Sequence, residues 1–367
     1  MRVYLLVMLL AAALTYLLVP VVLRVALATG AITQIRSRDV HTIPVARLGG
    51  VAMLLGFVAA LLIASQIPYL SAIFNSGSGV WGIVIGASAM CLLGVIDDIW
   101  ELNWYTKLAG EILAAGLMAW QGVQLVTLPL LGLTVGSTRL TLFTTIIAVV
   151  VVANAVNFVD GLDGLAAGVV GIAAFAFFIY SYYLTRGVSP GDYTSAATMA
   201  TAACVGICIG FLPHNFHPAR IFMGDSGALM LGTLVAGVSI LVTGQIDPAT
   251  AKTPAAIPAF MPLLIPLLIL VIPLVDLIWA VLRRVRQGRS PFSADAGHLH
   301  HRLLRHGHSH TAAVLVLYMW TAAASFSAVA AVIFPHLGLI PIILLIIAGC
   351  VFVTWRQMLT PSTQVEQ

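Results

Sequence analysis

The stretch "NAVNFVDGLDGLAAG", residues 154–168, places two asparagines and two aspartates between two apolar segments. The segments on either side, residues 140–153 and 169–184, contain no acidic or basic residue. A helix needs about 20 predominantly apolar residues to cross a bilayer. Each of these segments, extended by the residues next to it, is long enough for such a helix. The polar stretch is therefore expected at a membrane edge, between two spanning helices.

Composition extends this expectation to the whole chain. Hydrophobic residues make up 60% of the 367 residues and charged residues 8%, against roughly 25% charged residues in an ordinary soluble domain. The mean hydropathy of +1.05 indicates a polytopic membrane protein and not a soluble domain with one anchor. Because lipid leaves backbone groups no water partner, long apolar runs predict helices. We expect an all-α fold.

The hydropathy pattern predicts about eleven transmembrane helices in one integral-membrane domain, residues 1–367. The first apolar run is too long for the hydrophobic part of a signal peptide, so we expect it to be a span. The longest polar stretch is a loop rich in His and Arg, residues 283–311. The expected spans cover residues 3–25, 49–67, 80–97, 107–122, 140–156, 163–184, 196–212, 227–243, 258–282, 312–333 and 336–355.

The distribution of Lys and Arg predicts the orientation. With alternate loops assigned to opposite sides, thirteen of the 17 basic residues fall on one side and four on the other. The positive-inside rule makes the first side cytoplasmic, with the N-terminus outside and the C-terminus inside. Of the 13 acidic residues, only Asp192 and Asp247 fall outside. Acidic residues contribute little to topology, so their crowding on one face favours a functional site.

Five polar segments lie on this predicted cytoplasmic face. Each has a simpler interpretation: paired acids can cap helices, a Gly-Asp-Ser-Gly sequence suits a tight turn, and a histidine run can be a solvated loop. Their occurrence on one side of the membrane favours a shared site. The segments are residues 41–50 "HTIPVARLGG", 94–108 "GVIDDIWELNWYTKL", 154–168, 213–232 "PHNFHPARIFMGDSGALMLG" and 290–310 "SPFSADAGHLHHRLLRHGHSH".

These residue types suit phosphoryl transfer. Clustered Asp and Asn oxygens are the ligands that Mg²⁺ prefers, with Mn²⁺ as the alternative. Arg47, Lys107, Arg302 and the histidines supply donors and positive charge for phosphoryl oxygens. Acids, a divalent metal and basic groups on one face indicate phosphoryl transfer that involves a nucleotide or its sugar conjugate. The sequence contains no Walker A or Rossmann fingerprint.

Five motifs in order resemble those of the polyprenyl-phosphate N-acetylhexosamine-1-phosphate transferases. The resemblance covers about residues 30–310 and is greatest to the bacterial undecaprenyl-phosphate N-acetylglucosamine-1-phosphate transferases, which begin O-antigen, teichoic acid and arabinogalactan linker synthesis. Ala46 departs from the proline that often precedes the Arg-Leu-Gly-Gly motif. The motifs are "ARLGG", "DDIWEL", "NAVNFVDGLDGLAAG", "FMGDSGALMLG" and "SPFSADAGHLHHRLLRHG".

The resemblance assigns roles residue by residue. It implies that Asn157 and Asp225 hold Mg²⁺ together with the diphosphate of a UDP-sugar. Asp97 and Asp98 would lie where the lipid phosphate enters, with Asp97 as the base or phosphate-orienting group. Asp160 and Asp163 would line the site between. The residues expected to bind the substrates are Arg47, Lys107, Asn154, His298, His300, His301 and Arg302.

The implied reaction transfers GlcNAc-1-phosphate from UDP-GlcNAc to a polyprenyl phosphate, undecaprenyl or decaprenyl, with release of UMP. The site would face the cytoplasm in the bacterial inner membrane. No nucleic-acid partner is expected, and a homodimer is compatible with the sequence. Two alternatives stay open: the phospho-MurNAc-pentapeptide transferase of peptidoglycan synthesis, and a transporter. A transporter should place charges near mid-membrane within inverted repeats, which the sequence does not show.

Overall fold

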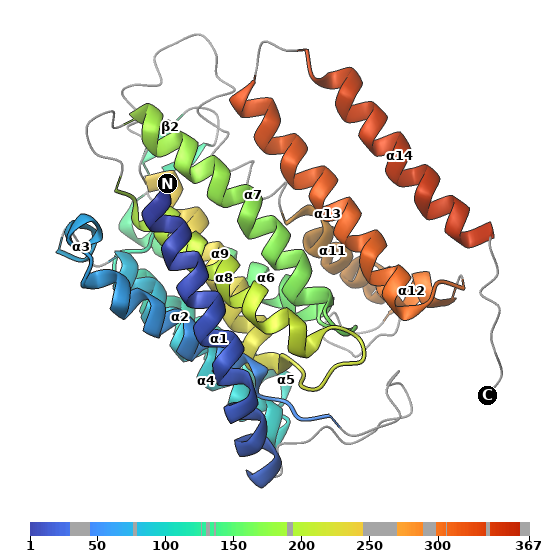
Figure 1. Cartoon of the computed structure of the whole chain (residues 1–367), viewed down its shortest axis with the longest axis horizontal. Coiled ribbons are helices and arrows are strands. Elements are labelled where there is room, and N and C mark those ends of the chain that lie inside the picture. The colour runs from blue at the N-terminus through green and yellow to red at the C-terminus, as the bar shows by residue number, and fades with distance from the viewer. Residues whose placement is uncertain are drawn as a thin grey trace.

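A computed structural model describes most of the chain as a bundle of helices (Figure 1). The described residues are 1–29, 45–75, 79–125, 127–129, 133–135, 137–188, 194–244, 270–288, 299–305, 307–334 and 338–359. The helices are α1 (Arg2–Thr29), α2 (Gly49–Ser65), α3 (Pro68–Asn75), α4 (Gly79–Trp100), α5 (Trp104–Trp120), α6 (Thr138–Val159), α7 (Leu165–Val188), α8 (Ala196–Asn215), α9 (Gly224–Gly244), α11 (Val271–Arg286), α12 (Leu299–Arg305), α13 (His310–Ile333) and α14 (Ile340–Leu359).

One small sheet is an exception to the expected all-α fold. Strands β1 (Thr127–Pro129) and β2 (Leu133–Val135) pair antiparallel in the link between α5 and α6. Their ladder gives hydrogen-bond partners to backbone groups that belong to no helix. The fold class is otherwise helical, as the sequence predicts.

Seven of the described helices are long and apolar enough to cross a membrane, and eight if the α2–α3 pair counts as one span. That pair is bent by 107°, and the expected span 49–67 corresponds to α2, which ends at the bend. Helix α5 has 17 residues, so it is shorter than the usual span of about 20 residues. Residues 258–269 of the expected span 258–282 lie outside the described residues. Seven or eight candidate spans therefore stand against the eleven expected from hydropathy.

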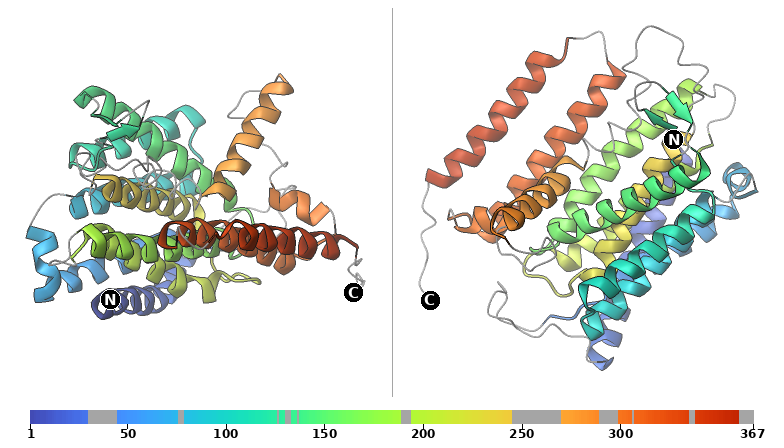
Figure 2. Two further views of the ribbon diagram at one scale, coloured as in Figure 1. Left: turned by 90° about the horizontal axis from the view of Figure 1, so that it is seen from above. Right: turned by 180° about the vertical axis from the view of Figure 1, so that it is seen from behind.

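Helix α9 is the centre of the bundle. In its most apolar stretch 94% of the residues are buried, against 33% in that of α1. It packs against α2, α4, α6 and α8 (Figure 2). Glycines make the close approaches possible: a Cβ on Gly94 of α4 would collide with the α9 backbone at Ser226, and one on Gly232 of α9 would come within 2.5 Å of the Cα of Ala153. Small residues are a common way to bring membrane helices together.

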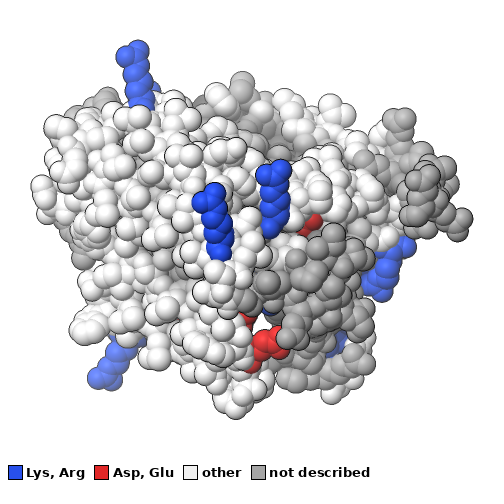
Figure 3. Space-filling model, turned by 60° about the horizontal axis from the view of Figure 1, so that its bottom comes forward, with Lys and Arg blue, Asp and Glu red and all other residues white. Residues whose placement is uncertain are grey.

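The links at one end of the bundle join the expected motifs. The carbonyl of Ala46 accepts a 2.8 Å bond from the N–H of Phe222, and the N–H of Gly49 donates to the carbonyl of Phe222 at 3.0 Å. This pairing connects the start of α2 with the start of α9. Figure 3 shows acidic atoms gathered in one area of this face of the molecule, with Lys and Arg side chains projecting from several other parts of it.

Candidate active site

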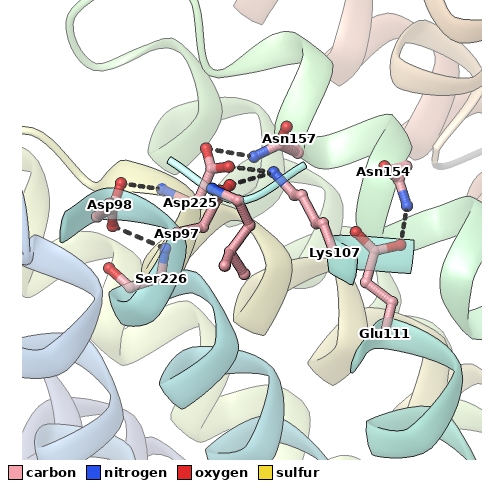
Figure 4. A network of polar contacts seen from close by, with 9 residues as sticks. Asp97, Asp98, Lys107, Glu111, Asn154, Asn157, Asp225 and Ser226 are labelled. Atoms are coloured by element: carbon pink, nitrogen blue, oxygen red, sulfur yellow. Dashed lines mark hydrogen bonds and ion pairs between the residues drawn. The ribbon is translucent and has the colours of Figure 1, made fainter. Parts of the chain in front are cut away.

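The N-terminus of α9 is held by a carboxylate from α4. Asp98 accepts hydrogen bonds from the backbone N–H groups of Asp225 at 3.0 Å and Ser226 at 3.1 Å (Figure 4). Gly224 has φ +70°, and a Cβ there would collide with the Asp98 carboxylate. A carboxylate at a helix N-terminus satisfies free N–H groups and opposes the positive end of the helix dipole. Asp98 therefore fixes where Asp225 is presented.

Lys107 of α5 lies between two carboxylates from different helices. Its Nζ donates to Asp97 Oδ2 at 2.8 Å and also contacts Asp225 Oδ2. The other oxygen of Asp97 accepts the N–H of Leu102 at 2.8 Å, which closes the turn between α4 and α5. Glu101 in that turn has a left-handed φ of 49°. The lysine thus joins α4, α5 and α9 at one point.

Asn157 completes this network from α6. Its amide nitrogen donates to Asp225 Oδ1 at 2.9 Å, so each oxygen of Asp225 has a different partner. We call Asp97, Lys107, Asn157 and Asp225 the acidic centre. Its two carboxylates and one amide oxygen form a donor set that Mg²⁺ accepts, since this ion usually binds one or two carboxylates and completes its shell with water and phosphate. One lysine leaves the two carboxylates with a net negative charge, so the donor chemistry fits a divalent cation.

Asn154, which the sequence predicts to bind substrate, contacts a carboxylate of α5 in the structure. Its amide nitrogen donates to Glu111 Oε2 at 2.5 Å and to the carbonyl of Val150 at 3.0 Å. Glu111 is 1% exposed and lies one helical turn after Lys107 on α5. Sequence analysis missed Glu111, although a glutamate four residues after a lysine inside an apolar helix is an unusual signal.

The two aspartates of the 154–168 stretch belong to different surroundings. Asp160 follows the end of α6 and remains partly exposed. Burial of its carboxyl raises its pKa to about 8, and the negative charges of Asp225 and Asp98 add to this rise. Asp163 is 3% exposed, and its carboxylate accepts from His217 and from the N–H of Ala219. The structure therefore places Asp160 within the electrostatic reach of the acidic centre and Asp163 beside a histidine.

The predicted basic residues are spread more widely. Arg47 is half-buried before α2, and its charge opposes the rise in the pKa of Asp160. Arg302 is exposed on α12. His298 lies outside the described residues, as do the side chains of His300 and His301 on the same short helix. The role of this histidine motif stays a prediction.

Helices long enough to span a membrane and a charged, metal-compatible network at one end of them define an integral membrane enzyme with an acidic centre. The helices that carry this network, α4 to α9, coincide with a known family pattern: residues 80–243 match glycosyl transferase family 4. The chain belongs to this family, since a relative matches most of its length.

Curated relatives extend the match beyond the network. The chain is 38% identical to the decaprenyl-phosphate N-acetylglucosaminephosphotransferase of Mycobacterium leprae over 83% of this chain and 77% of the relative. It is 32% identical to the "Probable undecaprenyl-phosphate N-acetylglucosaminyl 1-phosphate transferase" of Bacillus subtilis, over 83% and 78%. The phospho-N-acetylmuramoyl-pentapeptide-transferase of Thermosynechococcus vestitus is 46% identical, but over 16% of this chain and 15% of the relative. Similarity over most of the chain is thus to the relatives named for N-acetylglucosamine phosphate transfer.

Proposed function

We propose that this protein transfers GlcNAc-1-phosphate from UDP-GlcNAc to a polyprenyl phosphate, with release of UMP. The observation that carries the proposal is the acidic centre, in which Lys107 lies between Asp97 and Asp225 at one end of the helices. A lipid phosphate anchored in the membrane reaches such a position from the bilayer, while a nucleotide reaches it from water. The names of the relatives that match over 83% of the chain support the same substrates.

Asn157 and Asp225 would hold Mg²⁺, with Mn²⁺ as the alternative. The bound cation would offset the negative charge that keeps one phosphate away from another. Asp98 would act as a positioning residue, because its two bonds to the α9 N-terminus determine where Asp225 lies. Lys107 would contact phosphate. Its positive charge would also offset the repulsion between the two carboxylates.

Asp97 would orient the lipid phosphate or accept its proton. An oxygen of that phosphate then attacks the β-phosphorus of UDP-GlcNAc, a new P–O bond forms, and the bond to UMP breaks. Asp160 and Asp163 would line the site, with Arg47 near the diphosphate of the bound UDP-sugar. The histidine motif and Arg302 would cover the sugar nucleotide, and Asn154 would act through Glu111.

The proposed location is the bacterial inner membrane with the site facing the cytoplasm. The excess of Lys and Arg in loops at this end supports that orientation, because basic loops are retained in the cytoplasm. A cytoplasmic site also has access to a UDP-sugar.

Two other functions are tested by the same assay. The pentapeptide transferase differs in its sugar nucleotide, UDP-MurNAc-pentapeptide. A transporter would use acids near the middle of its spans, whereas the acids of the acidic centre lie at a helix end. Among the described residues, Asp276 is an acid in the position that a transporter would use, because it is buried inside α11.

The experiment measures UMP release by the detergent-purified protein. Release should require UDP-GlcNAc, polyprenyl phosphate and Mg²⁺ together, and the lipid product should carry GlcNAc and two phosphates. Turnover of UDP-MurNAc-pentapeptide with none of UDP-GlcNAc would assign the sister activity. UMP release that does not depend on the lipid would refute the proposed acceptor.

A further inference from the structure

Helix α13 contacts the turn between α6 and α7 through two side chains that have no part in the proposed reaction steps. His310 Nε2 accepts the backbone N–H of Asp163 at 3.0 Å, and the hydroxyl of Tyr318 donates to the carbonyl of Gly164. Positions 310 and 318 are eight residues apart, so they lie on the same side of the helix. Helix α13 therefore holds the backbone of two neighbouring residues in the turn that carries Asp160 and Asp163.

The same turn is held from its other side by the end of α8. Gly164 has φ +75°, and its N–H donates to Oδ1 of Asn215 at 3.0 Å. Asn215 is 3% exposed, and its amide nitrogen donates to the carbonyl of Ile221 at 2.9 Å. Backbone groups that belong to no helix need partners of this kind when they are buried. Asn215 thus fixes the turn relative to the segment that precedes α9.

The carboxylate of Asp163 is oriented by a second set of contacts. Its Oδ2 accepts the N–H of Ala219 at 3.1 Å and a bond from His217 Nδ1 at 2.8 Å. The ring of His217 stacks on that of His310, with centroids 4.3 Å apart and planes 17° from parallel. His310 therefore supports Asp163 twice, directly at the backbone and through the His217 ring. Partners of this kind keep a group in one orientation, which a residue that contacts substrate requires.

Helix α13 also packs against the segment that carries the histidine motif. Helix α12 lies beside the beginning of α13 (Figure 1). Its Leu303 belongs to one apolar cluster with Leu162 of the turn and with Val314 and Leu317 of α13. In the proposed reaction the histidine motif covers the sugar nucleotide. The turn, α12 and α13 therefore form one packed unit on the sugar-nucleotide side of the site.

We infer that His310 and Tyr318 are positioning residues for the sugar nucleotide, and that they act through the α6–α7 turn. The inference rests on the proposed function, which assigns Asp160 and Asp163 to the lining of the site. The lipid phosphate would instead meet Asp97, which α4 carries. Loss of a bond from α13 should therefore weaken the use of UDP-GlcNAc more than the use of the lipid.

The test measures UMP release by the detergent-purified full chain, with UDP-GlcNAc and polyprenyl phosphate varied separately at excess Mg²⁺. Tyr318→Phe removes one hydroxyl and keeps the ring that packs against Gly168. It should raise the KM for UDP-GlcNAc by roughly threefold to tenfold, as expected for one lost hydrogen bond, and change the KM for polyprenyl phosphate by less than about twofold. His310→Ala should have at least the same effect, because it removes both the backbone bond and the ring stack.

Two further variants separate positioning from simple packing. His310→Gln keeps an acceptor, because the amide oxygen of glutamine can take the N–H of Asp163, and it should recover most of the KM that His310→Ala loses. Thr354→Val is the matched control. It removes the hydroxyl that accepts the Nε1–H of Trp320 at 3.1 Å, a bond that ties α13 to α14 and not to the turn. It should lower thermal stability and leave both KM values unchanged.

Mg²⁺-dependent binding of UDP-GlcNAc gives the same comparison without turnover. Unchanged affinity in both Tyr318→Phe and His310→Ala would overturn the inference. So would equal rises in the two KM values, an equal effect of Thr354→Val, or a His310→Gln variant as weak as His310→Ala. A wild type that releases no UMP from UDP-GlcNAc would refute the proposed function, and the inference with it.

Discussion

At the scale of single residues, the partners of each acid separate their roles. Asp225 divides its two oxygens between Lys107 and Asn157, and in the proposed reaction it would be a metal ligand. Asp97 contacts the same lysine but uses its other oxygen to close the α4–α5 turn. The two carboxylates meet at one ammonium group and still face different substrates in the proposed reaction.

Asp225→Asn should abolish Mg²⁺-dependent binding of UDP-GlcNAc and turnover, because it removes one anionic ligand from a cation with few protein ligands. Asp97→Asn should lower turnover by about 10²–10⁴-fold if Asp97 acts as a base, yet leave that binding largely intact. The measurement is UDP-GlcNAc affinity as a function of Mg²⁺ concentration.

Glu101→Gln is the control for both variants, since Glu101 is an exposed acid in the same link. It should change neither binding nor turnover by more than a few-fold. Equal loss of Mg²⁺-dependent binding in Asp97→Asn and Asp225→Asn would contradict the division of roles.

Glu111 gives a second prediction at this scale. Glu111→Ala should leave the amide of Asn154 without its 2.5 Å partner, which costs about 1–3 kcal/mol for a buried polar group. Asn154→Ala should be less harmful in a Glu111→Ala background than alone, because the bond is already lost. A double-mutant cycle on thermal unfolding measures this coupling, expected at about 0.5–3 kcal/mol. Additive effects would show that the pair is not coupled.

At the scale of elements, the N-terminus of α9 is the part that the site depends on. Asp98 of α4 caps this N-terminus. The segment before α2 pairs with the segment before α9 through Ala46 and Ile221. At Ala46, where the family often has proline, the carbonyl accepts the N–H of Phe222.

Asp98→Ala should lower the stability by about 1 kcal/mol, as the loss of a helix cap usually does, and should reduce turnover by displacing Asp225. Asp98→Asn keeps one acceptor oxygen and should recover part of both. Ser137→Ala is a matched control, since Ser137 caps α6 in the link that follows the small sheet. It should lower stability with little effect on turnover. Equal loss of turnover in both capping variants would contradict a positioning role for Asp98.

At the scale of the whole molecule, the arrangement brings the polar ends of α4, α5, α6 and α9 to one side of the bundle (Figures 1 and 2). The central helix carries the site at its half-buried N-terminus, and the outer helices expose apolar surface, as α14 does along most of its length. In the proposed reaction, the lipid-linked substrate would approach the site along the outside of the bundle.

The proposed orientation predicts which positions react from each side. Single cysteines at Gln121 and Gln287, both exposed, should be labelled from opposite sides of the membrane in a background without the four buried native cysteines. The impermeant reagent should reach Gln121→Cys from outside and Gln287→Cys from the cytoplasm. Labelling of both from one side would exclude a topology with alternating loops between these positions.

The sequence by itself determined the membrane class, the helical fold and the acidic and amide residues of the centre. Hydropathy and charge are local properties, and motifs such as "DDIWEL" and "FMGDSG" mark unusual polar groups at the ends of apolar runs. Span counting was less reliable, because hydropathy does not show the 107° bend after α2 or the shortness of α5.

Only the tertiary structure decided which of these residues contact each other. Asp98 meets the α9 N-terminus across 127 positions, Asn154 meets Glu111 across 43, and Asp163 meets His310 across 147. No periodicity or spacing specifies such pairs, because they form when separate helices pack and each buried polar group must find a partner. Packing therefore assigned Asp98 to a cap, added Glu111 to the site and placed Asp163 with two histidines.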